Sequence, residues 1–141
     1  MLAAGALVVI LGCGGCSAPP PLPQNATPEA VARRYFELLA DGHDRAAREL
    51  IWRPHRYDGV VPETGYRGLT GLRVGASRPD TATNRPDEYR DLAELRLLRA
   101  EYVRHRTDSV GSAPGADGRF VLLGREGPDA PWLVIEVGTG P

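Results

Sequence analysis

The sequence predicts an α+β fold in which an N-terminal helical hairpin packs on an antiparallel sheet. Two observations support this prediction. Apolar residues recur at helical spacing after residue 27, and two β-rich runs surround a Gly- and Pro-containing turn near the end of the chain. Because the helices come first and the strands follow, we expect the helices to cover one face of the sheet. The 141 residues suffice for one domain with one core.

The first helix has clear start and stop signals. Thr27 is a good N-cap residue, Pro28 suits the first helical position, and Glu29 complements the helix dipole in the first turn. Gly42 supplies the usual C-terminal stop after Asp41. Between these ends, one wide apolar stripe is formed by Val31, Ala32, Tyr35, Phe36, Leu38 and Leu39.

A second, short helix is predicted from Arg45 to Trp52. Asp44 is positioned to cap its start, and Pro54 ends it because proline has no amide hydrogen. The two helices are then expected to pack as a hairpin.

The remaining chain is richer in strand signals. A strand is predicted near 69–76, and two β-rich runs at 119–124 and 132–137 flank the turn at 127–131, which is a hairpin signature. The segment 89–106 is ambiguous, because its apolar residues fit both a helical stripe and a long strand.

The first 28 residues contain no charged side chain and differ from the rest of the chain. The apolar run Met1–Leu11 is too short to cross a bilayer, which takes roughly 20 helical residues, and it matches the hydrophobic region of a secretory signal peptide. A Pro-rich segment follows from Ser17. These features predict a signal peptide at 1–12, a tether at 13–26 and one α+β domain at 27–141.

The sequence Ile10-Leu-Gly-Cys13 resembles the lipobox of bacterial lipoproteins, with an aliphatic residue three positions before the cysteine and a small residue just before it. The resemblance implies that the Cys13 thiol is alkylated with diacylglycerol, that the signal is then cut off, and that Cys13 as the acylated N-terminus anchors the protein to the membrane. Cys16 fits less well, since Cys13 would occupy its aliphatic position, but it stays an alternative. The segment departs from a usual signal in having no Lys or Arg after Met1, so a start upstream of Met1 stays open.

Other interpretations of the two cysteines have less support. Cys13 and Cys16 have thioredoxin-type spacing, but the prolines that follow cannot start the helix that motif requires. A zinc site would need more soft ligands than two cysteines. A disulfide or a spare thiol stays open. His43, His55 and His105 show no metal-ligand spacing, so we predict no metal and no cofactor.

The charge pattern argues against nucleic-acid binding. All 17 basic residues are Arg, and they are interleaved with 18 acidic residues. A nucleic-acid interface needs a one-sided basic field, which this pattern does not provide.

Two segments carry a resemblance to a known fold family. The stretch "ATPEAVARRYFELLADGHDRAARELI" resembles the opening of nuclear-transport-factor-2-like (NTF2-like) domains, and "RFVLLGREGPDAPWLVIEVGTGP" resembles the domain of unknown function 4829, a group of that superfamily found in bacterial lipoproteins. The resemblance implies a strongly bent, cone-shaped sheet with a pocket beneath the first helix. It also implies a long strand for the ambiguous segment 92–106.

Four aromatic residues are candidates for the lining of such a pocket: Tyr35, Trp52, Tyr102 and Trp132. Large aromatics are as readily core residues. A catalytic pocket would need a carboxylate base, for which Glu101 or Asp91 could be paired with Tyr35, Tyr57 or Tyr102, but no motif links them.

We therefore assign no catalytic residue. The sequence favours an envelope lipoprotein on the extracytoplasmic face of the cell membrane, whose non-enzymatic domain binds a small molecule or protein. The alternative is a small pocket enzyme of isomerase or dehydratase type that uses a buried carboxylate.

Overall fold

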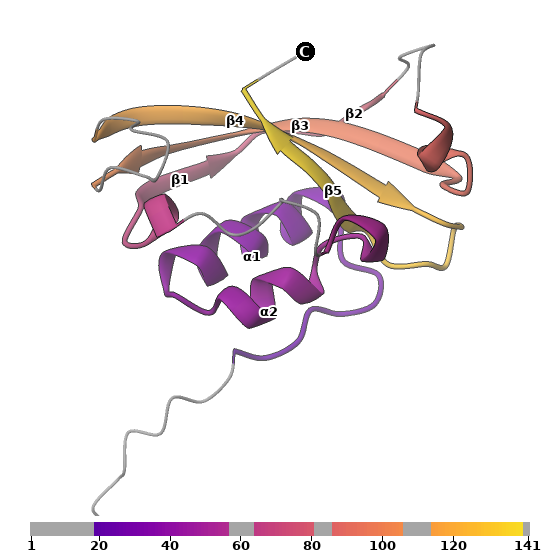
Figure 1. Ribbon diagram of the computed structural model, residues 1–141, viewed down its shortest axis with the longest axis horizontal. Coiled ribbons are helices and arrows are strands. Elements are labelled where there is room, and N and C mark those ends of the chain that lie inside the picture. The colour runs from indigo at the N-terminus through magenta and orange to yellow at the C-terminus, as the bar shows by residue number, and fades with distance from the viewer. Residues whose placement is uncertain (1–18, 57–63, 81–85, 106–113, 140–141) are drawn as a thin grey trace, which may run out of the picture.

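The computed structural model describes residues 19–56, 64–80, 86–105 and 114–139. These residues form two α-helices and an open, five-stranded antiparallel sheet (Figure 1). The sheet arches over the helices, which lie together on one side of it (Figure 1). The predicted α+β class, with helices on one face of an antiparallel sheet, is confirmed at this level.

Helix α1 spans Pro28–Ala40 and follows the predicted signals. The Thr27 side chain accepts a hydrogen bond from the amide of Ala30 at 3.2 Å, which is the N-cap interaction. The chain turns away after the helix at Gly42, whose φ of +77° suits glycine. The predicted apolar stripe is buried and faces the sheet and the second helix: Val31, Ala32, Tyr35, Phe36, Leu38 and Leu39.

Helix α2 spans Asp44–Glu49 and is shorter than predicted. The predicted cap is also wrong, because Asp44 is the first helical residue and its carboxylate pairs with Arg67. The helix ends early because the chain after it hydrogen-bonds to Val134. The Trp52 amide donates to the Val134 carbonyl, and the Val134 amide donates to the Leu50 carbonyl, both at 2.8 Å. The predicted last turn therefore lies along the edge of the sheet instead.

The sheet is built around one long antiparallel pair. Strand β3 (Glu94–Arg104) pairs with β4 (Gly115–Arg125) over its full length. Strand β5 (Leu133–Gly138) extends the sheet beyond β4, and β1 (Thr70–Val74) and β2 (Arg78–Pro79) share the other edge of β3. The ambiguous segment is thus a strand, and the predicted C-terminal hairpin is β4 and β5.

The side chains of β3 alternate between the two faces of the sheet. Leu98, Ala100, Tyr102 and Arg104 are buried on the inner face beneath α1, whereas Arg99, Glu101 and Val103 are exposed on the outer face. This period of two is the normal pattern of a strand that covers a core on one side.

Each face of the sheet carries a core. The main core joins α1 to the inner face. On the opposite face, near the start of β3, a smaller core is covered by the 3₁₀ turns η1 (Arg53–His55) and η3 (Asp87–Tyr89). A third turn, η2 (Thr64–Tyr66), precedes β1. The smaller core contains Trp52, Tyr89, Leu92, Leu95 and Ile135.

Glu29 fastens the start of α1 to the chain between β1 and β2. Its Oε1 accepts a hydrogen bond from the amide of Ser77 at 2.7 Å. Burial raises the pKa of Glu29, but the hydrogen bonds from Ser77 and Thr27 together outweigh it, so that the pKa lies below its ordinary value of 4.5. In the part of the chain that the structure describes, no helix is both long and apolar enough to span a membrane.

We predict that Gly124→Ala destabilises the domain by about 1–3 kcal/mol, because overpacking a filled core forces its neighbours to shift. A Cβ at Gly124 would lie 2.9 Å from both Leu92 Cδ1 and Leu95 Cδ2. Urea unfolding measures the change. Gly127→Ala is the matched control, since a Cβ there meets no atom within 4 Å. Equal stability of both variants would contradict the packing described for the smaller core.

We predict that Glu29→Gln weakens the fold at pH 7 and has little effect near pH 3. A carboxylate whose folded pKa lies below 4.5 contributes stability above its unfolded pKa, and that contribution is lost as pH falls through the folded pKa. The expected loss at pH 7 is about 1 kcal/mol. Urea unfolding at both pH values tests it, with the exposed Glu126→Gln as control; a loss that does not depend on pH would refute the assigned role.

Candidate functional site

The Pro-rich segment before α1 lies against the domain, and we call its described part, 19–26, the strap. Leu22 and Ala26 pack on the main core. The Arg34 guanidinium of α1 donates a hydrogen bond to the carbonyl of Pro20 at 2.6 Å. Figure 1 shows the strap running along the helices on the side away from the sheet. The segment predicted as a tether therefore contacts the domain over these residues.

A cavity of about 400 Å³ lies between the strap and the domain, and we call it the strap groove. Its walls are mostly apolar. Gln24, Arg34 and Glu49 supply the polar atoms of its lining. The apolar lining comes from α1, α2 and the start of β5, together with prolines: Val31, Leu38, Ala46, Leu50, Trp132 and Leu133. Such a lining can accept an apolar group but offers few hydrogen bonds to orient one.

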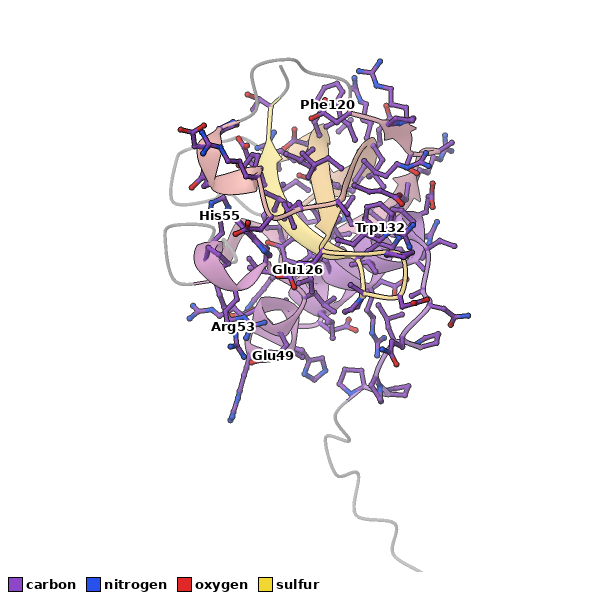
Figure 2. The ribbon with its side chains drawn as sticks, turned by 90° about the vertical axis from the view of Figure 1, so that its right-hand side faces the viewer. Glu49, Arg53, His55, Phe120, Glu126 and Trp132 are labelled. Carbon is purple, nitrogen blue, oxygen red and sulfur yellow. The ribbon has the colours of Figure 1, made fainter. Side chains whose placement is uncertain are left out.

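Trp132, labelled in Figure 2, lines the strap groove. The Arg125 guanidinium lies over its ring, 4.8 Å from the ring centroid, in a cation–π contact. Trp132 also borders a neighbouring cavity of about 370 Å³, which Gln24, Arg125 and Asp129 help to line. The ring thus separates an apolar groove from a more polar one.

A second polar feature lies on the inner face, where β3 ends and β4 begins. Arg104, only 1% exposed, forms an ion pair with Asp117. Arg119 donates to the same carboxylate at 2.9 Å, and the amide of Gly118 donates at 2.7 Å. The Arg104 guanidinium also lies 5.5 Å from the ring centroid of Tyr66. We call Tyr66, Tyr102, Arg104, Asp117 and Arg119 the ionic cluster.

The ionic cluster holds a carboxylate and a tyrosine close together, but it does not resemble an acid–base pair. Asp117 accepts from two guanidinium groups and one amide, which take up three of the roughly four lone-pair sites of a carboxylate. A general base needs a free lone pair aimed at the proton that it removes. Burial raises the pKa of Tyr102 well above its ordinary value of 10.0, with Tyr66 and Asp117 adding to the effect, so its hydroxyl stays protonated.

His55 fastens η1 to the sheet. Its Nδ1 lies 2.8 Å from the carbonyl of Ile135, and since a carbonyl only accepts, this nitrogen donates. Its Nε2 lies 3.5 Å from a carboxylate oxygen of Glu88. The ring packs edge-on against Trp52 and Tyr89. Through these contacts His55 joins η1 to β5 and to η3 at the smaller core. Its polar partners there are a carbonyl and a carboxylate.

The structure buries three of the four predicted pocket residues, Tyr35, Tyr102 and Trp132, in the main core and places Trp52 elsewhere. Tyr35 and Tyr102 both contact Phe36 in the main core. Trp52 belongs to the smaller core on the other face. Trp132 is the member of the set that lines the strap groove, and Figure 2 shows it apart from His55.

The other sequence candidates lie away from the inner face or outside the described residues. Glu101 is exposed and pairs with Arg99 at 3.1 Å on the outer face, and Asp91 is exposed. His105 contacts Thr70 through Nε2 at 2.8 Å. Within the described ranges, no three His, Cys, Asp or Glu side chains are grouped to hold a metal. Cys13, Cys16 and Tyr57 lie outside those ranges.

Sequence reasoning missed both the ionic cluster and the strap contacts. Once β3 is taken as a strand, Arg104 falls on the same face as Leu98, Ala100 and Tyr102, and a charge in that series indicates a buried ion pair. Its partner Asp117 could not be found this way, because it depends on the pairing of β3 with β4.

Comparison with known proteins gives no match: no protein-family model fits the chain, and no curated protein or solved structure is significantly similar to it.

We predict that Asp117→Asn lowers the free energy of unfolding by about 3 kcal/mol, because it removes the negative charge from the ion pair between Asp117 and the buried Arg104. Urea unfolding at pH 7 gives the value. The matched control is Glu101→Gln, which breaks an exposed pair on the neighbouring strand and should cost less than about 1 kcal/mol. Equal losses in the two variants would contradict the conclusion that the buried pair of Arg104 and Asp117 matters more to stability than the exposed pair.

Proposed function

We propose that the protein is an envelope lipoprotein whose domain binds a ligand or partner without catalysing a reaction. In this proposal residues 1–12 are a signal peptide, Cys13 carries the acyl chains, and the domain lies on the extracytoplasmic face of the cell membrane. The observation that carries it is the uncharged N-terminal segment with its Leu11-Gly-Cys13 sequence, together with a strap at 19–26 that packs on the domain.

The contacts of the strap support the proposed arrangement. A segment that only spaced a domain from its anchor would need no contacts of its own. Here Leu22 packs on the core and Pro20 accepts a hydrogen bond from Arg34. The contacts support a defined connection between the proposed anchor and the folded domain.

We also propose that the domain is NTF2-like and related to the domain of unknown function 4829. Support comes from the order of elements, two helices before the main sheet, and from the way the sheet arches over α1 (Figure 1). The long central β3 agrees with the strand that this resemblance implied.

The side chains of the strap groove and of the inner sheet face favour binding over catalysis. The strap groove is mainly apolar, with Arg34 among its few polar residues. On the inner face Asp117 is engaged by two guanidinium groups, whereas the alternative isomerase or dehydratase would need a carboxylate with a free lone pair. The described residues thus supply surfaces for apolar contact and a fixed ionic cluster.

We predict that the protein made in a bacterium with a lipoprotein pathway begins at an acylated Cys13. Mass spectrometry of the mature N-terminus would show the lipid adduct and loss of the first twelve residues. Cys13→Ser should abolish both changes and leave the precursor, since no other side chain at that position supplies the thiolate that accepts the lipid.

The control variant is Cys16→Ser, which should be acylated and processed like the native chain. An unmodified Met1 in the native protein, or normal membrane attachment of Cys13→Ser, would end the lipoprotein proposal. Acylation that is lost in Cys16→Ser and kept in Cys13→Ser would move the anchor to Cys16.

A further inference from the structure

The strap determines where the chain leaves the domain. The strap is the first segment that the structure describes and runs beside the helices on the side away from the sheet, and the outer face of the sheet lies at the opposite side of the domain (Figure 1). The exit point is held by Leu22 against the core and by Arg34 at Pro20. Whatever anchors the N-terminal segment therefore pulls on the helical side.

The chain between the proposed anchor and the exit point is short. Pro19 is six residues after Cys13, which gives at most about 20 Å of extended chain. A small domain is about 30 Å across. The connection is therefore too short for the far face of the domain to reach the surface that holds Cys13 while the strap stays in place.

We propose that the strap orients the domain on the membrane, with the helical layer of α1 and α2 apposed to the lipid surface and the outer sheet face directed away from it. The proposal rests on the proposed anchor at Cys13. The helical face lies against the bilayer in which the anchor is embedded. It is this face because the short chain from the anchor reaches the domain on its helical side.

The contacts of the strap make this orientation conditional. If the strap detaches from the domain, the free connection extends from Cys13 to Ala26, thirteen residues later, and its reach grows to about 45 Å. A connection of that length lets the domain turn any face toward the bilayer. The orientation is thus set by Leu22 and Arg34 and not by the anchor alone.

The orientation leaves a polar surface for partners. The outer face carries an open depression lined by exposed side chains of β1 and β3, among them Arg73, Arg99 and Glu101, and by Gly118 of β4. The Arg99 guanidinium lies 5.6 Å from the ring centroid of Phe120 on the same face. In the proposed orientation this face is the part of the domain most accessible from outside the membrane.

The experiment imposes the anchor chemically and measures the orientation. The full-length chain carrying Cys16→Ser is coupled through Cys13, its remaining thiol, to vesicles of neutral phospholipid with a small fraction of maleimide lipid. A donor fluorophore is placed on p-acetylphenylalanine, introduced in separate proteins at Arg45 of α2 and at Glu101 of β3, both exposed. Energy transfer to an acceptor on lipid headgroups is then compared between the two positions.

We expect severalfold stronger transfer from position 45 than from position 101. Leu22→Asp, which places a carboxylate against the core, and Arg34→Ala, which removes the donor to Pro20, should each bring the two transfer efficiencies close together. Arg33→Ala changes an exposed neighbour on α1 and should keep the native difference. Circular dichroism confirms that each variant is folded, and Arg34→Ala provides the test if Leu22→Asp is not.

Equal transfer from the two positions in the native strap, or a difference that survives both strap variants, would overturn the proposed orientation. Because maleimide coupling replaces the acyl chains, these outcomes do not depend on whether cells acylate Cys13. A chain that is not acylated in cells yet shows the expected difference would refute the lipoprotein proposal and leave the role of the strap in place.

Discussion

The pairing of β3 with β4 is the constraint on which the rest of the structure depends. Both strands have eleven residues and are paired from end to end. The pair supplies both faces that the other elements cover, the inner face under α1 and the outer face under η1 and η3. Because side chains alternate with a period of two, a slip by one residue would exchange the two cores.

The ionic cluster follows from this register. Arg104 ends the buried series of β3, and in the observed pairing Tyr102 lies opposite Asp117, which brings the carboxylate within reach of the guanidinium. Burying an ion pair often adds little net stability, because desolvation offsets the attraction, but separating its partners is costly. Since a slipped pairing would separate Arg104 from Asp117, the pair discriminates among registers more than it strengthens the chosen one.

Local signals predicted the parts of the fold that local interactions decide. Helix α1 has its cap at Thr27 and its stop at Gly42, and these were visible in the sequence. The end of α2 was not, because Leu50 and Trp52 hydrogen-bond to a residue of β5 more than eighty positions later. For the same reason, composition predicted a Pro-rich tether but could not show that Leu22 packs on the core. Contacts distant in sequence decided each of these outcomes.

The strap and the ionic cluster lie in different parts of the domain. The strap packs on the main core and accepts a hydrogen bond from Arg34 of α1, whereas the cluster joins η2 to the ends of β3 and β4. They share no residue, and sites without common partners usually contribute additively. Changes that release the strap should therefore alter how the domain is held while the sheet register persists. In the proposed arrangement this separation means that tension on the anchor does not act directly on the ion pair.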